Sequence, residues 1–206
     1  MTIFNFPQRS EEWYKIRIGK ITGSDFHTLM GNGETKKKLL LKKAVERITG
    51  KPQGDELKNS DIQRGVDLED TARTYYEMET GNTVNQVGFI QLNEYVGCSP
   101  DGLIGMDGIL EIKCPRATTF LSHYLDDSIE KQYYTQIQFN MMITGAKWCD
   151  FVRYNEDFPL YIKRVKADKE YQCRIRERLY ECIKEIEEMV NNYKERGKND
   201  NAGGCN

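Results

Sequence analysis

No apolar run in this chain of 206 residues approaches the roughly 18 residues that a membrane-spanning helix needs. The first residues, Met1 to Pro7, also lack the basic start and apolar stretch of a secretory signal. Hydrophobic residues make up 38% of the chain and charged residues 30%, which is typical of a folded soluble domain. We therefore expect a cytoplasmic protein that makes no contact with a membrane.

Several common catalytic motifs are missing as well. The two histidines, His27 and His123, cannot form the H-E-x-x-H motif of metallopeptidases. The six cysteines include no C-x-x-C pair, which argues against a zinc ribbon and favours free thiols in a reducing compartment. The glycine spacing of a P-loop is absent, and Asp101 stands where a nucleophile elbow needs its last glycine. The chain is therefore not expected to be a zinc peptidase, a P-loop NTPase or a serine hydrolase.

The chain has almost no net charge, because 30 Lys and Arg residues oppose 32 Asp and Glu residues. The distribution is uneven, however. Residues 1–60 carry a net charge of +5, residues 61–130 carry -9 and residues 131–206 carry +2. An acidic centre between basic ends indicates local sites that the average hides.

The order of the expected elements predicts one α/β domain. Apolar spacing predicts two short helices within residues 9–30 and longer helices over 35–48, 61–79, 128–144 and 168–193. Segments rich in Val, Ile and Tyr predict strands over 83–92, 95–99, 109–114, 148–154 and 160–166. The small polar residues near the C-terminus predict a disordered tail over 195–206, after a domain of residues 1–194.

The most informative segment is the strand over 109–114. Its alternation places Glu111 and Lys113 on one face and apolar residues on the other. The Asp107-Gly108 turn would fold the chain back and bring Asp101 beside Glu111. Two converging carboxylates repel each other unless a cation lies between them, and Mg²⁺ binds through carboxylates, waters and phosphate oxygens. A nearby lysine could then orient or help deprotonate a metal-bound water. The alternative is an exposed Glu–Lys pair of little energetic value, and the spacing alone leaves both open.

Glu69 is a second unusual carboxylate, because it falls on an apolar stripe of the helix expected over 61–79. A buried carboxylate is costly unless it is paired or bound to a metal. Arg73, four residues further on, is one possible partner. In the other interpretation, Glu69 faces the Asp101 and Glu111 site as a third acidic group.

Taken together, the motifs resemble the lambda exonuclease-like (YqaJ-type viral recombinase) family of the PD-(D/E)xK nuclease superfamily. The resemblance covers nearly the whole chain. The matching pieces are Trp13-x-x-x-Arg17-x-Gly19, Ile21-Thr22-Gly23-Ser24, Arg64-Gly65-x-x-x-Glu69-x-x-Ala72-Arg73, Cys98-Ser99-Pro100-Asp101-Gly102, Leu110-Glu111-Ile112-Lys113-Cys114-Pro115 and Tyr133-x-x-Gln136-x-Gln138. The fold it implies is a single PD-(D/E)xK nuclease-like domain, a central mixed β-sheet flanked by helices.

The activity implied by the resemblance is a Mg²⁺-dependent 5′-to-3′ exonuclease. Such an enzyme degrades one strand of linear double-stranded DNA and leaves 3′ single-stranded tails for phage-type recombination. In this family the residues matching Asp101 and Glu111 hold the metals, which implies two Mg²⁺ ions that Mn²⁺ could replace. The residue matching Glu69 and the backbone carbonyl at Ile112 help to hold these metals. The residue matching Lys113 assists the attacking water. Glutamines support the site, at positions matching Gln136 and Gln138.

The resemblance also implies a pocket for the 5′ phosphate, formed by Arg17, Ser24 and Ser99. The residues by themselves indicate less, since Ser24 could be a plain helix cap and Arg17 a surface arginine. Trp13 belongs to the same candidate DNA-binding set, with core packing as its alternative. The lysine-rich run over 36–43 is either a contact to the DNA backbone or a solvated helix face.

Three further expectations follow from the resemblance: a ring-shaped homotrimer around DNA, a single-strand annealing protein as partner, and a phage or prophage origin in a bacterial host. Two other functions remain open. One is an endonuclease of restriction or repair type on the same core, since a fold does not determine its substrate. The other is a non-catalytic protein that binds DNA ends.

Overall fold

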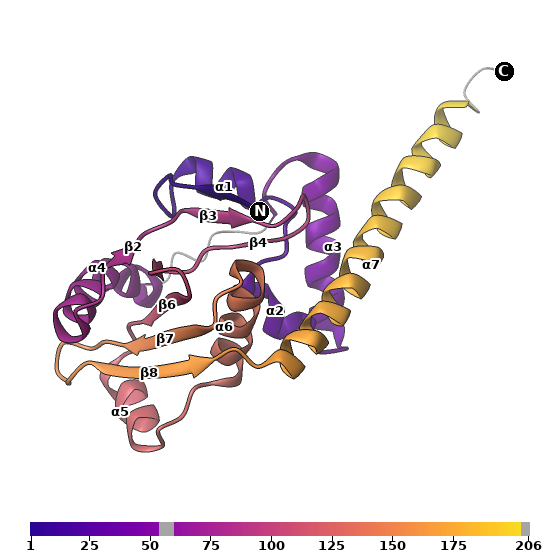
Figure 1. Cartoon of the computed structure of the whole chain (residues 1–206). Helices are drawn as coiled ribbons and strands as arrows, with labels where there is room; N and C mark the ends of the chain where they lie inside the picture. The colour runs from indigo at the N-terminus through magenta and orange to yellow at the C-terminus, as the bar shows by residue number, and fades with distance from the viewer. Residues whose placement is uncertain (54–59, 203–206) are drawn as a thin grey trace.

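The computed structural model describes residues 1–53 and 60–202, and it places a five-stranded sheet at the centre of the chain (Figure 1). In spatial order the strands are β2 (Val84–Asn85), β5 (Gly102–Ile104), β6 (Gly108–Lys113), β7 (Trp148–Arg153) and β8 (Tyr161–Lys166). Strands β6 and β7 run parallel, and the other neighbouring pairs are antiparallel. The expected α/β class with a central mixed sheet is confirmed.

Helices cover both faces of this sheet, because the residues of β6 alternate between two apolar cores. On one face, Ile109 packs with Ile137 of α6 (Lys131–Thr144). On the other, Leu110 packs with Tyr76 of α4 (Ser60–Thr80). This period of two residues is the strand geometry that the sequence predicts.

A second unit packs beside the sheet and contains, among the described residues, three further strands and four helices. Strands β1 (Thr2–Phe4), β3 (Phe89–Gln91) and β4 (Gly97–Cys98) form a small antiparallel sheet. The helices are α1 (Glu11–Arg17), α2 (Gly23–Leu29), α3 (Glu34–Thr49) and α7 (Lys169–Ala202). Apolar residues of α2, α3 and α7, such as Leu29, Leu40 and Ile175, share one core with Ile90 of β3.

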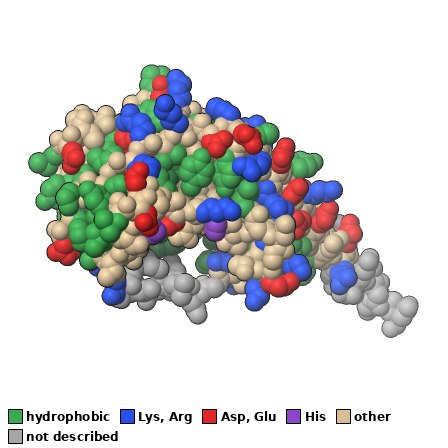
Figure 2. Space-filling model, turned by 90° about the horizontal axis from the view of Figure 1, so that it is seen from below, with side chains coloured by type: hydrophobic (Ala, Val, Ile, Leu, Met, Phe, Trp, Pro, Cys, Tyr) green, Lys and Arg blue, Asp and Glu red, His purple; other side chains and the backbone are tan. Residues whose placement is uncertain are grey.

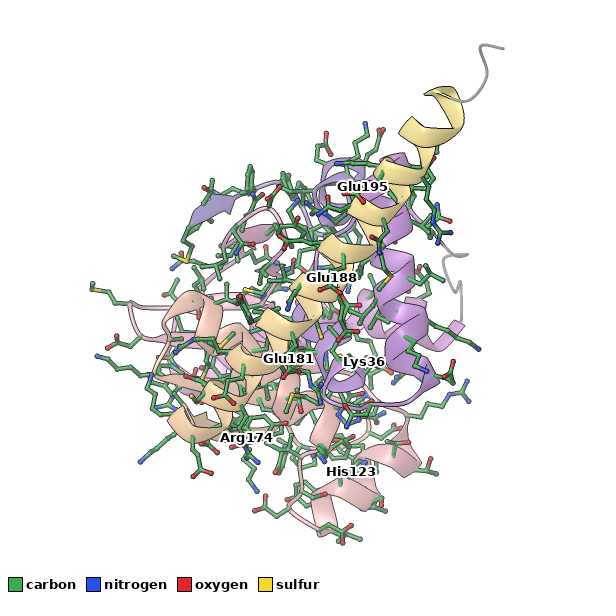
Figure 3. All side chains as sticks on the ribbon, turned by 90° about the vertical axis from the view of Figure 1, so that its right-hand side faces the viewer. Lys36, His123, Arg174, Glu181, Glu188 and Glu195 are labelled. Carbon is green, nitrogen blue, oxygen red and sulfur yellow. The ribbon has the colours of Figure 1, made fainter. Side chains whose placement is uncertain are left out.

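The long helix α7 lies along α3, and its C-terminal part extends beyond the body of the molecule (Figure 1). Its labelled acidic residues Glu181, Glu188 and Glu195 follow one another along the helix (Figure 3). Lys36 of α3 lies beside α7 and pairs with Glu185 at 2.7 Å. Within the described ranges, no helix is long and apolar enough to cross a membrane.

Two features of α7 and α5 differ from the sequence-based expectations. The disordered tail expected over 195–206 is wrong for its first part, because α7 continues to Ala202; residues 203–206 lie outside the described residues. Adding a residue to an existing helix costs far less than starting one, so the polar sequence does not end α7 near residue 193.

Helix α5 (Ala117–Leu125) was not predicted, and α6 begins at Lys131 rather than at residue 128. Threonine, histidine and aromatic residues give α5 a weak helical propensity. Its stability comes from tertiary packing: Phe120 is buried and stacks on Phe158, with ring centroids 4.9 Å apart.

Replacing Phe120 by alanine should therefore destabilise the protein by roughly 3–5 kcal/mol, because it removes a large buried side chain. Leu125→Ala is the matched control on the same helix, since Leu125 is 73% exposed. We expect the control to stay within about 0.5 kcal/mol of the wild type in urea unfolding. Equal effects of both variants would mean that α5 does not dock through Phe120.

Candidate active site

The β5–β6 hairpin brings Asp101, the residue directly before β5, to the edge of β6. The amide of Asp101 donates to the carbonyl of Leu110 at 3.0 Å. Its carboxylate Oδ2 accepts a hydrogen bond from the amide of Ile112 at 2.6 Å. The prediction that the hairpin places Asp101 beside the Glu111 strand is confirmed, and the side chain of Asp101 takes over from the β5 backbone as hydrogen-bond partner of β6.

Glu111 lies on the face of β6 that α6 covers and is 1% exposed. Its Oε1 accepts hydrogen bonds from Lys113 Nζ at 2.7 Å and from Gln136 Nε2 at 2.6 Å. Asn140 Nδ2 donates to Oε2 at 3.3 Å. The predicted Glu–Lys pair is therefore buried on its acidic side, and an exposed pair on a hairpin is excluded.

Helix α6 supplies one expected residue and one that the sequence analysis missed. Gln136 reaches Glu111 as expected. Asn140 was not predicted, although it lies one helical turn after Gln136 and so on the same face. That spacing of four residues was the available signal.

Gln138, in contrast, lies away from the carboxylates. Two residues along an α-helix turn a side chain by about 200° relative to Gln136. Its Nε2 donates to the carbonyl of Lys166 at 2.9 Å, and its Oε1 accepts from the amide of Asp168 at 2.9 Å. The expectation that Gln138 supports the site is wrong; this residue ties α6 to the start of α7.

The pKa values of Asp101 and Lys113 are both raised, but for different reasons. Burial, together with the charge of Glu111, raises the pKa of Asp101 to about 6. Burial alone would lower the pKa of Lys113, but the charges of Glu111 and Asp101 outweigh it and raise that pKa. Lys113 is therefore protonated at neutral pH, and the ionised form of Asp101 is disfavoured in the absence of a further cation.

Glu69 lines the same cleft as Asp101, but its partner is not Arg73. Arg9 Nη2 donates to Glu69 Oε1 at 2.6 Å, whereas Arg73 pairs with Asp70. Burial and the charge of Asp101 raise the pKa of Glu69, and Arg9 and Lys113 oppose this shift. The interpretation in which Glu69 faces the acidic site is supported, with an arginine that the sequence did not single out.

Trp13, Arg17, Ser24 and Ser99 also come together, in a second cluster. Trp13 Nε1 donates to Ser99 Oγ at 2.9 Å, and the Arg17 guanidinium lies over the Trp13 ring, 4.0 Å from its centroid. Arg17 reaches Ser99 Oγ at 3.5 Å and Thr22 Oγ1 at 3.3 Å, and the Thr22 hydroxyl lies 3.1 Å from that of Ser24. Thr22 is a further member that sequence reasoning did not include.

This cluster is a concentrated set of donors with one half-buried cation. Burial lowers the pKa of Arg17, against the opposing charge of Asp25. Ser99 is two residues before Asp101, so the same short segment serves the cluster and the carboxylates. Trp13 packs and hydrogen-bonds inside the cluster, so the structure leaves open both its packing role and its place in the candidate DNA-binding set.

The lysine-rich run over 36–43 is engaged within the protein. Lys36 pairs with Glu185, and the buried Lys43 lies 3.2 Å from Asp25. The face of the molecule seen in Figure 2 carries acidic and basic side chains interspersed rather than a field of one sign. These ion pairs give Lys36 and Lys43 a structural role, whereas Lys37, Lys38 and Lys42 are exposed, and for them the two interpretations stay open.

The carboxylates of Glu69, Asp101 and Glu111 are not directed at one common point in this structure. Among the residues that the structure describes, no three His, Cys, Asp or Glu side chains are arranged as a ready metal site. The contacts explain this arrangement, since Glu111 is held by Lys113 and Gln136 and Glu69 is held by Arg9. The donors nevertheless are hard oxygens, the ligand type that Mg²⁺ prefers.

The sheet with its Asp101, Glu111 and Lys113 constellation defines a nuclease-type domain. Residues 12–147 match the YqaJ-like viral recombinase domain, and the chain belongs to this family. No curated protein matches the chain.

Solved structures agree with this assignment. An alkaline exonuclease (LHK-Exo) from Laribacter hongkongensis is similar with a TM-score of 0.87 and 31% identity, over 92% of this chain and 99% of that one. Its complex with dAMP matches with a TM-score of 0.87, 32% identity and the same coverage. A phage-related exonuclease from Haemophilus somnus 129PT shares the fold, with a TM-score of 0.68 and 18% identity over 84% of this chain and 96% of that one.

The raised pKa of Asp101 predicts a pH-dependent stability. Because the folded state binds this proton more tightly than the unfolded chain, the wild type should lose stability as pH rises from about 4, near the pKa of an unfolded aspartate, to about 6, by at most about 3 kcal/mol. Asp101→Asn cannot ionise and should lose less over the same range. Urea unfolding in a chelator at pH 4 and pH 8 measures the difference, and parallel pH profiles of the two proteins would contradict it.

Proposed function

We propose that this protein is a metal-dependent exonuclease that degrades one strand of linear double-stranded DNA in the 5′-to-3′ direction. The observation that carries the proposal is that Asp101, Glu111 and Lys113 lie together, next to a second cluster of Trp13, Arg17, Ser24 and Ser99. The two are joined through Ser99, which is two residues before Asp101. A cluster that binds the terminal 5′ phosphate would set the scissile bond close to the strand end. Cleavage would then proceed from ends.

The donor set fits Mg²⁺, with Mn²⁺ as a substitute. Asp101, Glu111, Glu69 and the backbone carbonyl of Ile112 would hold two ions, all through oxygen. Bound metal would stabilise the attacking and leaving oxygens of the phosphate. The raised pKa of Asp101 beside Glu111 supports this fit, because a bound cation would favour the ionised form of both carboxylates.

Lys113 would act on the attacking water, and Gln136 and Asn140 hold Glu111 in place. Lys113 is partly exposed, with 26% of its side chain accessible, so its ammonium can orient a water while it stays bonded to Glu111. Gln136 and Asn140 fix the carboxylate of Glu111 from the other side. A glutamate that is held by three donors presents the same orientation to each substrate, which is the basis of preorganised catalysis.

The proposal extends to recombination. A strand-degrading enzyme of the YqaJ-like family would leave 3′ single-stranded tails for a single-strand annealing protein, and a ring-shaped homotrimer would keep the duplex enclosed. Analytical ultracentrifugation of the whole chain tests the trimer. A phage or prophage origin fits the family of viral recombinases that the chain belongs to.

Linear and circular DNA separate the proposed activity from its alternatives. With Mg²⁺, a linear duplex with 5′ phosphates should be converted to mononucleotides, whereas a covalently closed circle should remain intact. A duplex with a 5′-hydroxyl end should be degraded more slowly, because the cluster around Arg17 would have no terminal phosphate to bind. Equal digestion of circles, or products of defined length, would identify an endonuclease instead, and binding without any cleavage would identify an end-binding protein.

Lys113→Ala should lower the rate of strand degradation by about 10²–10⁴-fold, the usual contribution of a positioned proton-transfer group. Lys147→Ala is the control, because Lys147 is an exposed lysine that pairs with the exposed Asp107. Gel analysis of timed digests measures both rates, and circular dichroism verifies folding. Undiminished activity of Lys113→Ala would mean that the reaction occurs elsewhere.

A further inference from the structure

Arg9 combines an unusual backbone with a contact to the acidic site. It lies in the loop between β1 and α1 with φ of 67°, one of two non-glycine residues with positive φ in the part of the chain that the structure describes. This left-handed conformation costs a residue with a Cβ about 1–2 kcal/mol, whereas glycine adopts it freely. The guanidinium forms the 2.6 Å ion pair with Glu69.

The loop holds Arg9 between two anchored neighbours. Gln8 Nε2 donates to the carbonyls of Val87 and Pro100, each at 2.9 Å. Ser10 caps α1 by accepting from the amide of Trp13 at 3.3 Å. Since Pro100 directly precedes Asp101, the backbone of Arg9 is fixed relative to the carboxylates, and only its side chain is free to change partner.

The Arg9–Glu69 pair stands between two adjoining clefts. One cleft, of about 480 Å³, contains Arg9, Glu69 and Asp101. The other contains Arg9 and Glu69 again, together with Ile112 and Lys113. The pair thus lines both the cleft that contains Asp101 and the cleft that contains Lys113. Both members remain reachable from solvent, since 37% of the Arg9 side chain and 20% of the Glu69 side chain are exposed.

We propose that Arg9 binds a phosphate of the nucleic-acid strand and that its ion pair with Glu69 is exchanged for that phosphate when the strand enters the cleft. The exchange would free Glu69 for the metal. A guanidinium suits this role, because its planar fork binds carboxylate and phosphate oxygens in the same bidentate manner. A partly exposed ion pair is weak enough to be replaced. This inference rests on the proposed function.

Arg9→Gly in the full chain is the decisive variant, because glycine keeps the backbone conformation without strain. Affinity for a 5′-phosphorylated duplex, measured by fluorescence anisotropy with Ca²⁺ in place of Mg²⁺ to suppress cleavage, should fall about tenfold. The slope of log affinity against log salt should fall by about 0.9, the value for one lost phosphate contact. Without DNA, Mn²⁺ binding measured by calorimetry should become tighter by severalfold, because Glu69 no longer has a competing cation.

A permanent structural pair predicts the opposite pattern. Unchanged DNA affinity and salt slope, with Mn²⁺ affinity unchanged or weakened, would overturn the exchange. Arg9→Lys keeps the charge without the fork and should fall between the wild type and Arg9→Gly in both measurements. It also serves if Arg9→Gly does not fold. Lys147→Ala controls for the loss of one positive charge and should leave the Mn²⁺ affinity unchanged.

The wild type distinguishes the two levels of inference. If the wild-type protein binds neither duplex DNA nor Mn²⁺, the proposed function is wrong and the exchange is wrong with it. If the wild type binds both and Arg9→Gly behaves like the wild type, only the exchange at Arg9 is wrong. Strand degradation by the wild type in Mg²⁺, measured in parallel, confirms which of the two cases applies.

Discussion

The burial of the Glu111 carboxylate against α6 is the constraint on which the site depends. An ionised carboxylate that loses its water must recover the lost hydrogen bonds from the protein. Lys113, Gln136 and Asn140 provide them from one strand and one helix. The same contacts that satisfy the charge therefore dock α6 on the sheet and fix the ammonium beside the carboxylate, so fold and chemistry share one set of hydrogen bonds.

A second set of contacts connects this centre to the N-terminal segment. Ser99 Oγ donates to the carbonyl of Gly88 at 2.8 Å, and Gln8 holds the carbonyl of Pro100. The chain between Ser99 and Asp101 is thus fixed from two sides. The Arg17 cluster and the acidic cleft are held in one geometry, because they are joined by a short anchored segment rather than by a flexible loop.

The local features of the site could be predicted from the sequence. The alternation of β6 and the Asp107-Gly108 turn are short-range signals, so Asp101, Glu111 and Lys113 were placed together correctly. Glu69 was recognisable because a carboxylate interrupts an apolar stripe. Arg9 was not, since its partner is 60 residues away and a single arginine in a loop has no periodicity. Helix α5 and the three-residue β1 failed to give a signal for a related reason: tertiary contacts stabilise them more than their own propensities do.

The parallel pairing of β6 with β7 has a consequence for how the site is assembled. Parallel neighbours require a crossover, and here α5 and α6 form it. Gln136 and Asn140 reach Glu111 only as part of that crossover. A chain that ends before β7 therefore has β6 without its parallel neighbour. The residues that complete the parallel pair and those that hold Glu111 thus come from one continuous segment, so the sheet and the site are built from the same crossover.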